Sequence, residues 1–115
     1  MRNDKRNIIV ELSFKFALEI IKFCDHLTEL RRYRLADQLF RSGTSIGANI
    51  REAQNAQSKM DFIHKMKVAA KEADETEYWL LLCKESRIKN SDEILASLQE
   101  LIKILSKIIS TSKKN

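Results

Sequence analysis

The stretch Arg41-Ser-Gly-Thr-Ser-Ile-Gly-Ala-Asn-Ile-Arg-Glu-Ala53 decides the fold. It holds both glycines of the protein, Gly43 and Gly47, in a segment that otherwise has a helical pattern and in a chain without proline. Each glycine costs about 1 kcal/mol relative to alanine inside a helix, so the pair needs a structural reason. Because the two glycines lie one turn apart, a second helix can approach them almost backbone to backbone. The sequence therefore predicts a close contact between two helices at this point.

The composition around this stretch is that of a single globular domain spanning residues 1–115. Hydrophobic residues make up 43% of the chain and charged residues 32%. Two glycines and no proline leave few turn signals, which excludes a many-stranded β fold. The polar start of the chain does not resemble a signal peptide, and no run approaches the ~20 apolar residues of a membrane span. We expect a cytoplasmic protein without a membrane association.

Apolar residues recur every three or four positions in four segments, about 7–27, 31–57, 59–87 and 92–110. Ser58 followed by Asp61 predicts a capped start for the third segment, and Ser91 predicts the cap of the fourth. We expect residues 111–115 to be loose. Because the connections are short, the sequence predicts an all-α, antiparallel, up-down-up-down four-helix bundle.

Each segment has an apolar stripe that is expected to face the bundle interior. Counting outward from the connection near Ser58 places Gly43 level with Glu72 and Ala73, so we expect the glycines to face the third helix. The predicted inward stripes are Ile9, Ser13, Phe16, Ala17, Ile20, Cys24 and Leu27; Leu35, Leu39, Gly43, Ile46, Ile50 and Ala53; Phe62, Met66, Ala69, Ala73 and Leu80; and Leu95, Leu98, Ile102, Leu105 and Ile109.

Three of the helices also have apolar residues away from these stripes. A monomer rarely exposes contiguous apolar patches of this kind, so the sequence predicts self-association. These residues are Val10, Phe14, Leu18 and Ile21 in the first helix; Val68, Trp79 and Leu82 in the third; and Ile94, Leu101 and Ile108 in the fourth.

No motif predicts a catalytic residue, a metal site or a cofactor site, so we expect no enzyme. A di-iron bundle needs Glu-x-x-His on two helices, whereas the nearest match here is Asp61-x-x-His64. Cys24 and Cys83 have no partner at ligand spacing, and we expect reduced, partly buried thiols. The glycines lack the Lys-Ser/Thr that follows the glycine-rich loop of a P-loop.

Two polar residues on or beside the apolar stripes need a structural explanation. Glu77 projects onto the apolar face of the third helix, where a carboxylate needs a partner. The level count places it opposite Gln38 with Arg41 one turn away, so we expect a contact with one of these two. Asn49 is expected to be a satisfied polar group between helices or between subunits.

The chain is basic, with a net charge of +5 and a pI near 9.3. Arg31, Arg32, Arg34 and Arg41 lie within eleven residues, with Asp37 the one acid among them. If the second helix has begun by Arg31, then Arg31, Arg34 and Arg41 lie on one side of this helix. Such a face suits phosphate, as in nucleic acid, but a solvated face with internal ion pairs has the same pattern. A cluster of acids on the third helix is expected to pair with a basic patch of a neighbouring subunit; it consists of Glu72, Asp74, Glu75 and Glu77.

The chain also resembles a known family. The matching residues are Gln38-x-x-Arg41-Ser-x-x-Ser45-Ile46-x-x-Asn49-Ile50-x-Glu52-Ala53, followed by Asp61-Phe62-Ile63 and by Lys71-Glu72-Ala73-Asp74-Glu75-Thr76-Glu77-Tyr78-Trp79-Leu80. This pattern is similar to that of the four-helix bundle proteins first named for open reading frames in intervening sequences of bacterial large-subunit ribosomal RNA. The resemblance covers about Ser13 to Ile109. The chain lacks the proline that many members carry near the first junction, where Thr28 stands, so the geometry of that junction is open.

The resemblance implies a ring-like homo-oligomer, most commonly a pentamer, without catalytic activity. It also implies association with structured RNA or DNA, or with a reverse transcriptase, because relatives are accessory proteins of diversity-generating retroelements. Arg31, Arg32, Arg34 and Arg41 are the candidate nucleic-acid contacts, and Gly43, Gly47, Asn49 and Glu77 the candidate structural residues. The alternative is a homo-oligomeric protein–protein scaffold whose basic residues only keep it soluble.

Overall fold

The computed structural model describes residues 4–114, and these residues form four α-helices without a strand. The helices are α1 (Asp4–Glu29), α2 (Tyr33–Ala53), α3 (Lys59–Glu85) and α4 (Ser91–Lys114). The all-α fold class is confirmed. Three bounds differ clearly from the predicted ones: α2 begins after Arg31 and ends before Gln57, and α4 continues through residues 111–114, which were expected to be loose.

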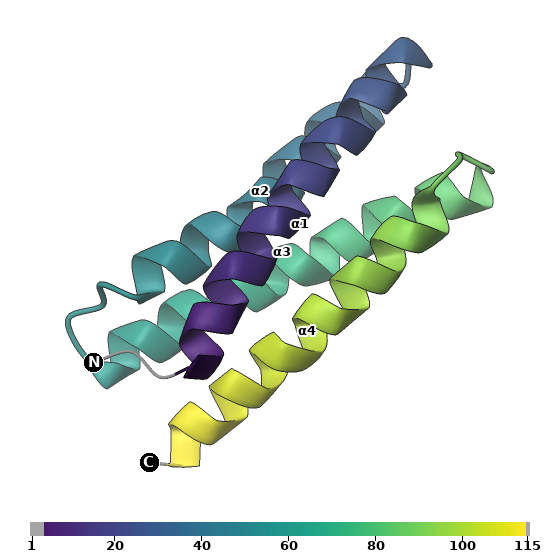
Figure 1. Cartoon of the computed structure of the whole chain (residues 1–115). Helices are drawn as coiled ribbons and strands as arrows, with labels where there is room; N and C mark the ends of the chain where they lie inside the picture. The colour runs from purple at the N-terminus through teal and green to yellow at the C-terminus, as the bar shows by residue number, and fades with distance from the viewer. Residues whose placement is uncertain (1–3, 115) are drawn as a thin grey trace.

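The four helices pack as an antiparallel bundle of about 46 × 20 × 19 Å. Each helix contacts its two neighbours, α1 with α2, α2 with α3, α3 with α4 and α4 with α1, whereas the diagonal pairs make no close backbone contact within the described residues. Figure 1 shows the α1–α2 and α3–α4 turns at one end of the bundle and the α2–α3 connection at the other. This arrangement is the predicted up-down-up-down topology.

Both of those turns close with the same hydrogen-bonding pattern at the end of a helix. After α1, the Arg31 amide donates to the Thr28 carbonyl at 2.9 Å and the Arg32 amide to the Leu27 carbonyl at 2.8 Å. Arg31 has a φ of 62°, in the left-handed region that glycine usually supplies at this position of a Schellman motif. Arg31 therefore belongs to the turn, and the prediction that it shares a helical sector with Arg34 is wrong.

The α3–α4 turn repeats this geometry with another arginine. Arg87 has a φ of 61° and donates its amide to the Lys84 carbonyl at 2.9 Å, while the Ile88 amide donates to the Cys83 carbonyl at 3.0 Å. Ile88 is buried, as the residue after the left-handed position usually is in this motif. The α1–α2 and α3–α4 turns thus each carry an exposed arginine.

Of the two predicted N-terminal serine caps, the structure contains that of α3 but not that of α4. The Ser58 hydroxyl accepts a hydrogen bond from the Asp61 amide at 3.0 Å, and the Asp61 carboxylate accepts from the Gln57 amide at 3.2 Å, so the cap of α3 is confirmed. Ser91 is instead the first residue of α4, and its buried hydroxyl donates back to the Ile88 carbonyl at 2.7 Å. Its short side chain ties the turn to the helix rather than capping it.

The core contains the predicted stripes of α1, α2 and α3 almost in full. On α4 the prediction is wrong in part, because Ile94, Leu101 and Ile108 are buried and not on an outer surface. These residues lie beside Leu98 and Leu105 on a single broad apolar arc. An arc this wide fits a helix that packs against two neighbours, so it is no sign of a second, exposed stripe.

The glycines make a close contact, but with α1 and not with α3 as predicted. A Cβ atom built on Gly43 would lie 2.8 Å from Ile20 Cγ1, and one built on Gly47 would lie 3.3 Å from the backbone carbonyl oxygen of Ser13. The predicted heights along α3 were right to within one helical turn, since the Thr76 hydroxyl donates to the Ser42 hydroxyl at 3.0 Å and Arg41 pairs with Glu72 and Glu75. The residue next to Gly43 therefore faces α3, while the glycine itself is turned toward α1.

Replacing Gly47 by leucine should push α1 away from α2, because the new side chain would meet rigid backbone and not a flexible side-chain end. We expect Gly47→Leu to lower the free energy of unfolding by more than about 2 kcal/mol, the upper part of the range for overpacking. Ala96→Leu is the control, because Ala96 is exposed on α4 away from Gly47 and should change stability by less than about 0.5 kcal/mol. Urea unfolding followed by circular dichroism measures both. Equal stability of Gly47→Leu and the parent would show that α1 does not rest on Gly47.

Candidate functional site

Three of the four candidate arginines lie at the α1–α2 turn. Arg31 occupies the left-handed position of the turn, Arg32 precedes the first residue of α2, and Arg34 is the second residue of α2. All three side chains are exposed, and none of the ion pairs found within residues 4–114 involves them. Their guanidinium groups are available to an anionic ligand. We call these residues the arginine turn.

The α3–α4 turn lies at the same end of the bundle and adds positive charge there (Figure 1). Arg87 and Lys89 are exposed in or beside that turn, whereas Lys84 is paired with Asp92 at 3.3 Å. Sequence reasoning missed Arg87 and Lys89, because they are more than fifty residues away from the arginine turn. The signal that could have found them is the up-down topology, which brings the first and third connections to one end.

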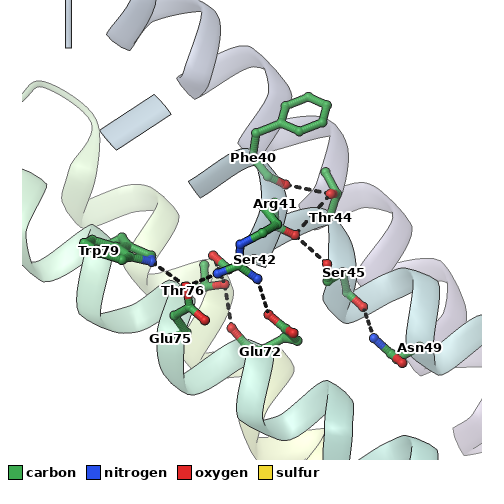
Figure 2. A network of polar contacts seen from close by, with 10 residues as sticks. All are labelled: Phe40, Arg41, Ser42, Thr44, Ser45, Asn49, Glu72, Glu75, Thr76 and Trp79. Carbon is green, nitrogen blue, oxygen red and sulfur yellow. Dashed lines mark hydrogen bonds and ion pairs between the residues drawn. The ribbon is translucent and has the colours of Figure 1, made fainter. Parts of the chain in front are cut away.

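Arg41 does not belong to this group, since it is held within the α2–α3 pair. Its guanidinium contacts the carboxylate of Glu72, Nη1 to Oε1 at 3.3 Å, and it pairs through Nη2 with Glu75. The Glu75 carboxylate also accepts a hydrogen bond from the Trp79 indole at 2.9 Å. Figure 2 shows this fork, in which Arg41 lies between two carboxylates of α3. The acids Glu72 and Glu75 therefore pair within their own chain, contrary to the prediction of an intersubunit contact.

The predicted contact of Glu77 with Arg41 or Gln38 is wrong. The half-buried Glu77 carboxylate accepts a hydrogen bond from the side-chain amide of Gln99, which lies on α4. Glu72 and Glu77 are five residues apart, so they point about 140° away from each other around the α3 axis. Glu72 faces α2 and Glu77 faces α4. Counting residues outward from the α2–α3 connection predicts the height of a residue along the bundle but not which neighbouring helix its side chain faces.

The Asn49 side-chain amide is satisfied within its own helix and not between helices, which was the first of the two predicted alternatives; the contact between subunits stays a prediction. Its side-chain amide donates to the Ser45 carbonyl at 2.8 Å. The Ser45 and Thr44 hydroxyls do the same one turn earlier, at 2.5 Å to the Arg41 carbonyl and 2.6 Å to the Phe40 carbonyl. Figure 2 shows these bonds following one another along α2. In each of these bonds a side chain donates to a carbonyl of the preceding turn of its own helix, so the side chains do not form a ligand site.

Both cysteines are free and buried, as predicted for reduced thiols. The Cys24 thiol donates to the Ala36 carbonyl at 3.4 Å and thereby links α1 to α2. Burial, with a smaller effect of Asp25, raises the pKa of Cys24 to about 12. Burial also raises the pKa of Cys83 to about 11, although the positive charge of Arg32 acts in the opposite direction. Both groups are poor nucleophiles at neutral pH, because the thiolate is the reactive form.

The described residues hold no arrangement typical of a metal site. Among the side chains that the structure describes, those of residues 8–114, no three of His, Cys, Asp or Glu come together as metal ligands would. None of the helices in this range is both long and apolar enough to cross a membrane. The candidate site is therefore a surface with exposed cations and not a pocket with reactive groups.

Comparison with known proteins shows a family match and a similarity to a solved structure. Residues 5–111 match the model of the 23S rRNA-intervening sequence protein family. The fold is similar to a crystal structure, at 1.70 Å resolution, of a protein with unknown function from the S23 ribosomal protein family of Bacteroides thetaiotaomicron. The two are 41% identical with a TM-score of 0.87, and the match covers 92% of this chain and 98% of that one. No curated protein matches the chain.

The buried thiols give a prediction about reactivity and pH. We expect iodoacetamide at pH 8 to alkylate Cys24 and Cys83 at least about 100-fold more slowly in the folded protein than in urea, with mass spectrometry as the readout. Because folding raises both pKa values above the ordinary 9.0, the neutral thiols favour the folded state. Stability should therefore fall as the pH rises from about 9 toward 12. Rapid alkylation of either cysteine without denaturant would contradict its burial.

Proposed function

The chain belongs to the 23S rRNA-intervening sequence protein family, and from this premise we propose that it is a non-enzymatic, ring-like homo-oligomer that binds structured RNA or other nucleic acid. The arginine turn is the proposed contact. One observation carries this proposal: Arg31, Arg32 and Arg34 are exposed together and take part in no ion pair of the described residues. Arg87 and Lys89, at the same end of the bundle, extend the positive surface.

The chemistry of the arginine turn suits phosphate better than any other common ligand. A guanidinium is planar, always charged and able to donate two hydrogen bonds to one phosphate. A carboxylate ligand would have the same fork geometry, but the excess positive charge of the whole chain favours a polyanion. We leave Arg41 out of the proposed contact, because Glu72 and Glu75 already bind it. Its role in this proposal is to hold α2 on α3.

An apolar patch on the outer side of α1 and α2 supports the proposed self-association. Phe14 is 59% exposed, Leu18 53%, Ile21 37% and Phe40 49%. Because Gly47 lies against Ser13 and Gly43 against Ile20, these four side chains come from turns at the same heights of the two helices. A groove of about 220 Å³ continues the patch and is lined by Phe14, Ala17, Thr44, Gly47, Ala48 and others. We propose that a second copy of the chain covers this patch.

Repetition of one contact closes a ring when the rotation between subunits divides a full turn, and closure prevents an open filament. Five subunits is the number that the family resemblance implies. The partner in this proposal is a structured RNA or DNA in the cytoplasm, with a reverse transcriptase as the protein that the oligomer assists. The second candidate function is a protein–protein scaffold without nucleic acid, and the apolar patch alone favours it.

The RNA contact predicts a specific loss of binding. We expect Arg31→Glu/Arg32→Glu/Arg34→Glu to weaken binding of a labelled RNA hairpin at least about tenfold at ~0.1 M salt in fluorescence anisotropy, because it replaces phosphate contacts by repulsion. The change lowers the net charge of the chain from +5 to −1, since each replacement removes two charges. Arg41→Ala should leave binding intact and lower stability by up to about 1 kcal/mol, as expected for a partly exposed ion pair.

Lys15→Glu/Lys22→Glu is the control, because both lysines are exposed on α1 outside the arginine turn. This double variant should bind the hairpin almost as well as the parent. If the triple arginine variant also binds like the parent, while keeping its helix content, the arginine turn is only a solvated surface and the scaffold function takes its place.

If the apolar patch is the contact between subunits, charged substitutions in it should dissociate the oligomer. Phe14→Glu/Leu18→Glu should convert the oligomer into a 13.4 kDa monomer that keeps its helix content, because charged side chains cannot be buried unpaired in a subunit contact. Light scattering after size-exclusion chromatography measures the mass, with Lys15→Glu/Lys22→Glu again as control. A parent protein that is monomeric at micromolar concentration would contradict the proposed oligomer.

A further inference from the structure

A second concentration of positive charge lies in the half of the bundle away from the arginine turn. After Glu100, α4 carries four lysines and no acidic residue. The first half of α3, which runs beside this part of α4 in the opposite direction, adds two more exposed lysines. We call the group the lysine face; it consists of Lys67, Lys71, Lys103, Lys107, Lys113 and Lys114, all exposed.

These lysines point to one side of the α3–α4 pair. At 3.6 residues per turn, Lys103, Lys107 and Lys114 fall within a sector of about 40° on α4, and Lys67 and Lys71 lie one turn apart on α3. The proximity of Lys113 lowers the pKa of Lys67.

Nearer the α3–α4 turn, Lys84 meets Asp92 at 3.3 Å and the Glu77 carboxylate accepts a hydrogen bond from Gln99, so complementary groups meet there. The ion pairs found among the described side chains include none of the six lysines of the lysine face. Their ammonium groups are available to an anionic ligand.

The nearby acids do not neutralise the lysine face. Asp61 is paired with Lys65 at 3.7 Å, and Lys65 is not part of the face. Glu72 and Glu75 are bound by Arg41 of α2. Asp74 is the one acid of residues 59–75 that lies outside the ion pairs of the described side chains. The face therefore keeps an excess of positive charge over a length of about 15 Å, from Lys103 to Lys113.

We propose that the lysine face is a second nucleic-acid contact, which binds consecutive phosphates of a duplex backbone at a place separate from the arginine turn. This inference rests on the proposed nucleic-acid function. A length of about 15 Å faces roughly nine phosphates of a duplex, which presents one charge per 1.7 Å. Lysine is a flexible point charge without the fork geometry of arginine, so the face reads the backbone and not the bases. RNA and DNA duplexes should bind to it with similar affinity.

The test measures binding of a fluorescein-labelled 20-base-pair RNA duplex to the full chain between 50 and 200 mM salt. We expect Lys67→Glu/Lys107→Glu/Lys113→Glu to weaken binding at least about tenfold at 0.1 M salt and to lower the slope of log K against log salt by about one per lost contact. Lys67→Arg/Lys107→Arg/Lys113→Arg is the matched control. It keeps every charge at the same position and should bind like the parent.

The outcomes separate this inference from the proposed function. If the glutamate variant binds like the parent while the triple arginine variant loses binding, the lysine face is wrong and the arginine turn stands. If the parent binds no duplex but binds vesicles with ~30% phosphatidylserine, and the glutamate variant does not, the face contacts lipid and the inference is overturned. Circular dichroism checks that each variant is folded. Should the glutamate variant unfold, Lys→Gln at the same three positions replaces it, with the same expected loss of binding.

Discussion

The contact between the α2 glycines and α1 is the constraint on which the rest of the bundle depends. With no side chain at Gly43 and Gly47, α2 comes close enough for Ile20 and the Ser13 backbone to fill the space where Cβ atoms would stand. This contact sets the rotation of α2 about its own axis. Neighbouring residues are directed accordingly: Ser42 points at Thr76, and Arg41 reaches Glu72 and Glu75. The same rotation leaves Phe40 on the outside, beside the exposed residues of α1. One close approach thus positions both the α2–α3 ion pairs and the apolar patch.

Much of the fold could be predicted from the sequence, because apolar periodicity and short connections determine helix number, order and direction. The heights of α2 residues along α3 were also right to within one turn, as the Ser42–Thr76 bond shows. The direction around the helix was not predictable in the same way. Each helix of a square bundle packs against two others, and a buried stripe does not tell which neighbour a given residue faces. The glycines and Glu77 were assigned to the wrong neighbour for this reason, and Ile94, Leu101 and Ile108 were assigned to the outside because two adjacent stripes were taken for two faces.

The site was less predictable than the fold, because its geometry depends on turns that carry no recognisable signal. Both helical hairpins end in a Schellman motif with arginine where glycine is usual, so no glycine marks the turn. The left-handed conformation of Arg31 takes this residue out of the helix and separates it from Arg41. What the sequence suggested was one basic helical face. The structure instead contains an exposed group at the turn and a paired arginine in the middle of the bundle. The chain composition alone could indicate excess positive charge but not which cations are bound internally.

The distribution of paired and unpaired charge fits a subunit contact along the long side of the bundle. In the middle of α2 and α3, Arg41 is paired with two acids, so this region contributes stability more than attraction for an anionic ligand. The unpaired cations lie toward the two ends, at the arginine turn and along the lysine face. The apolar patch runs along the outer side of α1 and α2, and in a ring it would contact a different surface of the next subunit. In a closed ring built through that patch, the positive ends of successive subunits would lie next to each other. A ring of this kind would combine several weak, non-specific phosphate contacts into one strong and salt-dependent interaction, because the contacts of separate subunits act on the same polyanion.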